Sequence, residues 1–129
     1  MCIRDSTYWV PSHSTRSFVQ TVDVVSGPGY DRVAPLSVAI RTGHEIRRVV
    51  SNLAVMDFEA SGADTGEPPQ MRLRSVHPGV TVEEVVEATG FELVVPDEVY
   101  ERRLPTDIEL HLIREVLDPR GLRKAEIGG

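Results

Sequence analysis

The sequence has 129 residues, of which 40% are hydrophobic and 26% are charged, and its formal net charge is −6. These values are typical of one soluble globular domain that buries a core of its own. The negative charge, with arginines scattered singly, argues against a nucleic-acid partner and against an anionic membrane surface. No apolar run approaches the roughly 20 residues that span a bilayer, so we expect no membrane segment.

The first six residues differ from the rest of the chain. Residues 1–6, MCIRDS, lack the apolar segment of a signal peptide and are similar to the translated end of a sequencing-library adapter. We therefore expect residues 1–6 to be non-native. The only cysteine, Cys2, lies here, so we expect neither an intrachain disulfide nor a cysteine-based metal site. A cytoplasmic location fits this cysteine usage.

Two strand-like runs follow. Residues 7–10 are aromatic and β-branched, and residues 17–25 are rich in valine. From the second run we expect five side chains in the core: Phe18, Val19, Val22, Val24 and Val25.

Residues 26–30, SGPGY, predict a turn, because Gly27 and Gly29 permit tight backbone paths and Pro28 fixes its own φ angle. A backbone that closely approaches a ligand is the alternative, but no strand–GxGxxG–helix pattern surrounds this glycine pair. Residues 31–47 are mixed in composition and indicate no particular element.

Three further strands are predicted in the middle of the chain. Residues 47–53 and 54–59 are typical of strands in quick succession, and residues 71–76 alternate apolar and polar side chains. The Gly- and Pro-rich stretch 61–70 predicts a solvated loop that joins 54–59 to 71–76 as an antiparallel pair. Residues 77–79, HPG, predict a turn in which the glycine adopts a positive φ.

Two Thr-x-x-Glu capping boxes predict where helices begin. Thr81 and Glu84 would start a helix at Val82, and Gly90 would form its left-handed C-cap. One face of this helix would carry Val82, Val85, Val86 and Thr89.

The rest of the chain predicts a strand, a link and a last helix. Residues 91–95 resume a strand-like pattern, and residues 97–104 form a charged surface link. Thr106 and Glu109 make the second capping box, and residues 118–119, DP, end the helix. The whole pattern predicts a packed α/β or α+β fold that contains an antiparallel strand pair. We expect the last helix to dock through an apolar stripe made of Ile108, Leu112, Ile113, Val116 and Leu117.

The polar residues indicate no catalytic group. The serines lack the Gly-x-Ser-x-Gly context of an exposed nucleophile, and the adjacent Glu83 and Glu84 are explained by the helix N-terminus. His77 could line a pocket, although a hydrogen bond at the end of a strand is the simpler interpretation. We expect no metal, because none of the four histidines has the spacing of a metal site: His13, His44, His77 and His111.

One cluster of large amphipathic side chains remains, Tyr8 and Trp9 with His13 close behind. Such groups often cover a flat ligand or line a subunit contact. These three residues are therefore candidates for a substrate or subunit interface, and packing in the core is the simpler alternative.

Several stretches resemble the C-terminal half of the β subunit of type I CoA-transferases. They are TYWVPSHS and VDVVSG within residues 7–30, RVVSNLAVMDF at 48–58, RSVHPGVTVEE at 74–84 and RLPTDIELHLIREVLDP at 103–119. Residues 7–129 are accordingly identified as the C-terminal portion of a single CoA-transferase-like β-subunit domain. The resemblance implies an α/β fold, with a mixed sheet that includes an antiparallel strand pair and with two C-terminal helices. The first two stretches and the RLPTD start of the last helix are most similar to the family branch that opens a steroid ring in cholesterol catabolism.

The resemblance implies an enzyme subunit that works with a related α subunit on an acyl-CoA, with coenzyme A as part of the substrate and no bound cofactor. In the transferases a glutamate attacks the thioester, and a Gly-rich loop stabilises the oxyanion. No segment here matches either feature, so no catalytic residue is assigned. In the steroid branch the working glutamate lies on the α subunit and the reaction is hydrolytic.

Two alternatives stay open. One is a transferase β subunit of the glutaconate or 3-oxoacid type, and the other is a non-catalytic binding module. If the chain is a β subunit of either the hydrolase or the transferase, it is part of a larger subunit and inactive alone. It should then leave unpaired strand edges and an exposed apolar face.

Overall fold

The computed structural model describes residues 6–25, 27, 29–30, 46–58 and 69–127. The strands are β1 (Ser6–Val10), β2 (Ile46–Ser51), β3 (Ala54–Phe58), β4 (Met71–Val76) and β5 (Tyr100–Glu101). The helices are α3 (Val82–Glu87), α4 (Asp107–His111), the π-helical η1 (Leu112–Leu117) and α5 (Arg123–Ile127). Several predictions fall outside these residues, namely those for Cys2, Ser26, Pro28, His44 and most of residues 31–47 and 61–70.

The five strands form one mixed sheet in the order β1-β2-β3-β4-β5. β1 pairs with β2 in parallel, β3 is antiparallel to both β2 and β4, and β5 is parallel to β4. The predicted antiparallel pair of β3 and β4 is therefore confirmed. Because only β3 runs in the opposite direction, the other four strands all end at the same side of the sheet.

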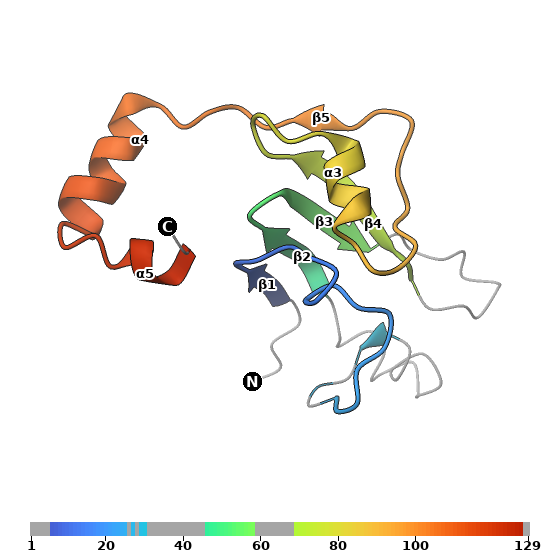
Figure 1. The fold of residues 1–129 in the computed structure, drawn as a ribbon. Helices are drawn as coiled ribbons and strands as arrows, with labels where there is room; N and C mark the ends of the chain where they lie inside the picture. Colours follow the sequence, from blue (N-terminus) through green and yellow to red (C-terminus); the bar gives the residue numbers. More distant parts are fainter. Residues whose placement is uncertain (1–5, 26, 28, 31–45, 59–68, 128–129) are drawn as a thin grey trace, which may run out of the picture.

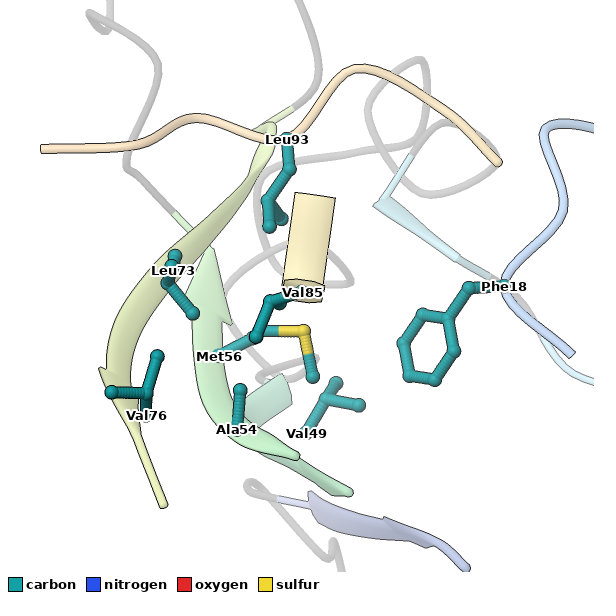
Figure 2. Close-up of a cluster of buried hydrophobic side chains, with 8 residues drawn as sticks. All are labelled: Phe18, Val49, Ala54, Met56, Leu73, Val76, Val85 and Leu93. Atoms are coloured by element: carbon teal, nitrogen blue, oxygen red, sulfur yellow. The ribbon is translucent and has the colours of Figure 1, made fainter. Parts of the chain in front are cut away.

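Helix α3 covers one face of the sheet and closes the core (Figure 1). Its Val85 is fully buried and points at the side chains that β2, β3 and β4 present on this face (Figure 2). The core cluster consists of Phe18, Val49, Ala54, Met56, Leu73, Val76, Val85 and Leu93.

A bulge in β4 keeps this face apolar. Val55 pairs with Ser75 and Met56 pairs with Leu73, so Arg74 is an extra residue with no partner of its own in the register. In a strict alternation, Leu73 and Val76 would point to opposite faces of the sheet, because they are three residues apart. The extra residue at Arg74 lets both side chains reach the core.

Both predicted capping boxes are present. The Thr81 hydroxyl accepts the Glu84 N–H, and the Glu84 carboxylate accepts the Thr81 N–H at 2.7 Å. Thr106 and Glu109 repeat the arrangement at α4. Gly79 has the expected positive φ of 80°. These local predictions succeed because donor and acceptor are three residues apart.

The prediction that Gly90 forms a left-handed C-cap is wrong. The C-cap is Ala88, in right-handed helical geometry, and the positive-φ glycines of the described residues are Gly79 and Gly121. Gly90 instead donates its N–H to the Phe18 carbonyl at 2.7 Å. A Cβ at residue 90 would lie 2.6 Å from that oxygen, so a close backbone approach explains this glycine.

The prediction of a buried strand at residues 17–25 is also wrong. Only Phe18 is buried, and Val19 forms a single bridge to Gly90. Among the described residues, neither sheet nor helix covers the remaining valines, and 51 to 81% of their surface is exposed: Val22, Val24 and Val25. A run of β-branched residues becomes a buried strand only where tertiary partners cover it.

The segment after α3 differs from its prediction in two places. Residues 91–95 contribute one bridge, in which Val94 bonds to the backbones of Met71 and Leu73, and do not form a strand. The link 97–104 contains the short strand β5, which adds a fifth strand beside β4. The charged sequence of this link did not indicate a strand, because β5 depends on its pairing with β4.

Candidate functional site

The ends of β1, β2, β4 and β5 meet at one side of the sheet, which we call the carboxyl edge. Ligands in open α/β sheets bind beyond the carboxyl ends of parallel strands. The residues that follow three of these strands make contact here: His13 after β1, Ser51 and Asn52 at the β2–β3 turn, and His77 after β4.

His13 lies at the centre of this junction and is 6% exposed. Its ring stacks on Phe18 with centroids 3.9 Å apart. Nδ1 lies 2.8 Å from Ser51 Oγ, and Nε2 lies 3.0 Å from Thr89 Oγ1 at the end of α3. The backbone N–H of His13 donates to Asn52 Oδ1 at 2.7 Å. One residue thus joins the end of β1 to the β2–β3 turn and to α3.

The hydrogen bonds define the tautomer of His13. Thr89 donates its hydroxyl proton to the Val85 carbonyl at 2.7 Å, so Thr89 Oγ1 must accept from Nε2–H. In neutral His13, Nδ1 is then the acceptor, and it takes the Ser51 hydroxyl proton at 2.8 Å in preference to the Ala54 carbonyl, which lies 3.3 Å from Ser51 Oγ. Burial lowers the pKa of His13, which also favours this neutral form.

The Ser51–His13 pair has the distance of a nucleophile and its base, but it cannot act as one. Ser51 has no exposed surface, and its Oγ already accepts the N–H groups of Leu53 and Ala54 at 3.2 and 3.1 Å. No substrate atom can reach it. The described contacts of this pair are therefore those of a structural hydrogen bond.

His77 binds the same turn from the other side. Its Nε2 donates to the Ser51 carbonyl at 2.9 Å, and its backbone N–H donates to the Leu53 carbonyl at 2.8 Å. The simpler interpretation of His77, a hydrogen bond at the end of a strand, is confirmed. Two histidines from the ends of β1 and β4 therefore hold the β2–β3 turn between them.

The face of the sheet opposite α3 carries an ion-pair cluster. Asp57 is 5% exposed and accepts two hydrogen bonds from Arg72, at 2.9 and 3.1 Å, and one from Arg74 at 3.0 Å, with Arg48 at 3.7 Å. Burial alone would raise the pKa of Asp57, but the bonds and charges of Arg72 and Arg74 hold it below its usual value. This cluster ties β3 to β4.

Tyr8 and Trp9 do not pack in the core. They lie on β1, at one edge of the sheet, and 50% and 54% of their surfaces are exposed. His13 is buried, so it does not share their environment. The core-packing alternative is wrong for Tyr8 and Trp9, and their role at an interface stays a prediction.

The C-terminal residues 103–127 form a helical arm that projects away from the sheet (Figure 1). Its hydrogen bonds and ion pairs with other described residues stay inside the arm, including Arg103–Glu109 at 2.7 Å and Arg123–Asp118 at 2.8 Å. The expectation that the last helix docks on this chain is wrong, because its apolar stripe is 43 to 76% exposed: Ile108, Leu112, Ile113, Val116 and Leu117.

Sequence reasoning missed Ser51, Asn52 and Thr89, and it also missed the Asp57 cluster. The first three gave no signal, because they meet His13 across 38, 39 and 76 residues. The Asp57 cluster did have a signal in the sequence, because Arg72 and Arg74 alternate along one strand and a neighbouring strand carries the acidic Asp57. Within the residues that the structure places, no group of three or more His, Cys, Asp or Glu could hold a metal, and no helix is long and apolar enough to cross a membrane.

No protein-family model matches the sequence. The cholesterol ring-cleaving hydrolase IpdB subunit of Mycobacterium tuberculosis is 51% identical over 122 residues, which cover 95% of this chain and 46% of that protein. The IpdB subunit of Rhodococcus jostii is 48% identical over 122 residues, with the same two shares. A 3-oxoadipate CoA-transferase subunit of Pseudomonas knackmussii is 33% identical over 66 residues, 51% of this chain and 23% of that protein.

Solved structures have the same fold. The crystal structure of Rhodococcus jostii IpdAB superposes with a TM-score of 0.76 and 42% identity, over 97% of this chain and 48% of that chain. The crystal structure of the decarboxylase AibA/AibB superposes with a TM-score of 0.68 and 27% identity, over 95% of this chain and 42% of that chain. Glutaconate coenzyme A-transferase of Acidaminococcus fermentans superposes with a TM-score of 0.73 and 24% identity, over 99% of this chain and 46% of that chain. At this identity the similarity shows the fold alone.

These similarities fit a β subunit of the CoA-transferase family. Within that family the chain is similar, along nearly its whole length, to the IpdB subunit of the cholesterol ring-cleaving hydrolase. It spans 46% of the length of these IpdB relatives.

Proposed function

We propose that this chain is part of the β subunit of an enzyme that opens a steroid-derived ring on an acyl-CoA by hydrolysis. The observation that carries the proposal is the 51% identity over 122 residues with the IpdB subunit. In this proposal the partner is a CoA-transferase-family α subunit that supplies the working glutamate, coenzyme A is part of the substrate, and the enzyme acts in the cytoplasm without a bound metal.

The geometry supports a β chain that does not itself attack the substrate. The hydroxyl best placed for activation, that of Ser51, is fully buried and already saturated with hydrogen bonds. Tyr8, Trp9 and the stripe of the helical arm are exposed apolar surfaces. Exposed apolar surface of this extent is typical of a chain that assembles with more polypeptide.

The proposed reaction balances with water alone. Water adds to the ring ketone, the neighbouring ring C–C bond breaks, and the released carbon takes a proton. The product is a carboxylic acid that is heavier by one water and still carries its thioester.

The test uses the full-length subunit co-expressed with a candidate α subunit and incubated with a steroid-derived CoA ester that contains a ring ketone. We expect a product heavier by one water in the absence of any acceptor acid, and no product when either subunit is omitted. Turnover only after a carboxylic acid is added, with coenzyme A recovered on that acid, would contradict the proposal.

That second outcome defines the alternative function, a CoA-transferase β subunit. The similarity to the 3-oxoadipate CoA-transferase subunit favours it, although this similarity covers only 51% of the chain. The same assay separates the two functions, because a transferase leaves the ring closed.

A further inference from the structure

His13 is the one titratable group in the described residues that is buried and has no ionised partner there. The Phe18 ring and the Ser51 and Thr89 hydroxyls face it. On the adjacent elements, His77 bonds to the Ser51 carbonyl, whereas Arg16 on the segment after β1 and Glu84 and Glu87 on α3 are exposed. No ion pair joins His13 to any of these groups.

The hydrogen bonds around neutral His13 are complete. Nε2–H donates to Thr89, the Ser51 hydroxyl donates to Nδ1, and the two lone pairs of Ser51 Oγ accept the N–H groups of Leu53 and Ala54. Every donor has one acceptor.

A proton on Nδ1 would leave one donor too many. Nδ1–H would then point at Ser51 Oγ, whose lone pairs are both occupied. The Ser51 hydroxyl could turn to the Ala54 carbonyl at 3.3 Å, but either Nδ1–H or one of the turn amides would still lose its acceptor. Ala54 is fully buried, so water cannot replace that bond without opening the turn.

We infer that His13 is a pH-sensitive latch: when neutral it fixes the end of β1 and the end of α3 to the β2–β3 turn, and when protonated it releases them. The latch consists of His13, Ser51 and Thr89. It makes His13 a positioning residue for the carboxyl edge, and it does not depend on which CoA-ester reaction the enzyme performs.

The sign of the pH dependence follows from burial. The pKa of His13 is lowered from 6.5 in the fold, so below about pH 6.5 the unfolded chain takes up a proton that the folded chain does not. The stabilising effect of the latch is therefore complete above that pH and is lost progressively as the pH falls toward the folded-state pKa.

The first test measures the melting temperature of the full-length subunit, with any partner that remains bound, between about pH 8 and about pH 5. The variants are His13→Gln, which cannot titrate, and His111→Gln, a control at an exposed histidine. We expect the wild type and His111→Gln to lose the same number of degrees on acidification, and the latch accounts for about 2 to 8 °C of that loss for each unit by which the pKa of His13 is lowered. His13→Gln should lose clearly less, and an equal loss in all three proteins would overturn the inference.

The second test does not require the variant to fold. Ring-labelled histidine in the wild type should show one buried residue, assigned to His13, with a proton on Nε2 and none on Nδ1 at neutral pH. That signal should titrate below 6.5. A proton on Nδ1 at neutral pH, or titration at or above 6.5, would refute the latch, and neither result would bear on the proposed hydrolase activity.

Discussion

The carbonyl oxygen of Phe18 occupies the space that a side chain at Gly90 would need. Gly90 donates its N–H to this oxygen at 2.7 Å, and a Cβ there would approach it to 2.6 Å. This contact joins the segment after β1 to the end of α3, next to the His13 latch.

Gly90→Ala should therefore destabilise the fold by about 1–3 kcal/mol, because one of two backbone segments must move. Chemical denaturation of the full subunit measures the change. Gly27→Ala is the matched control, since a Cβ at residue 27 meets nothing within 4 Å. Equal stability of the two variants would show that the Phe18–Gly90 contact is not tight.

Asp57→Asn should weaken the pairing of β3 with β4. The buried carboxylate is replaced while Arg72 and Arg74 stay, and because these arginines are partly exposed we expect a loss of about 1–3 kcal/mol. The pKa of Asp57 is lowered from 3.8, so its contribution is present above that pH and is lost as the pH falls through the folded-state pKa.

Acid unfolding curves measure this second effect. The wild type should lose stability more steeply than Asp57→Asn as the pH falls below about 4. Parallel curves would mean that the carboxylate is not held by the arginines.

Glu109 should titrate far below an ordinary glutamate. The hydrogen bond from Arg103 and the backbone bond from Thr106 lower its pKa from 4.5 to about 2. In Arg103→Gln the pKa should rise toward the usual value, which carboxyl NMR measures directly. Arg114→Gln is the control, because Arg114 lies on the same arm and the Glu109 carboxylate is paired with Arg103 instead. An unchanged pKa in Arg103→Gln would rule out the ion pair.

Trp9 offers a direct test of the predicted subunit interface, because it is the only tryptophan in the sequence. It is 54% exposed in the isolated chain. If a partner covers β1, Trp9 emission should shift to shorter wavelength when the full subunit, with any tryptophan outside this sequence replaced, assembles with an α subunit that has no tryptophan of its own or has had it replaced. An unchanged spectrum in a formed complex would place the interface elsewhere.

The parts of the fold that the sequence predicted depend on near neighbours. The capping boxes at Thr81 and Thr106 join groups three residues apart, and β3 and β4 pair across one loop. The failures depend on distant partners: no element that the structure describes covers Val22 and Val24, and the backbone of Phe18 lies against Gly90. No local pattern could have shown that His13, Ser51 and Thr89 meet.

The stripe of the last helix illustrates the same limit. The sequence pattern predicted an apolar stripe from Ile108 to Leu117, and the capping box and the end of the helix are confirmed, although Leu112–Leu117 is π-helical. What that face contacts depends on residues far away in sequence or on another chain. Periodicity indicates that a face is to be buried and does not name the surface that buries it.

The most direct test of the proposed function follows the oxygen atom of water. The full subunit, assembled with its α subunit, is incubated in ¹⁸O-labelled water with a ring-ketone CoA ester. We predict one labelled oxygen in the new carboxylate of the ring-opened product, with the thioester intact and no acceptor acid present. An unopened ring with coenzyme A transferred to an added acid would contradict the proposed hydrolysis.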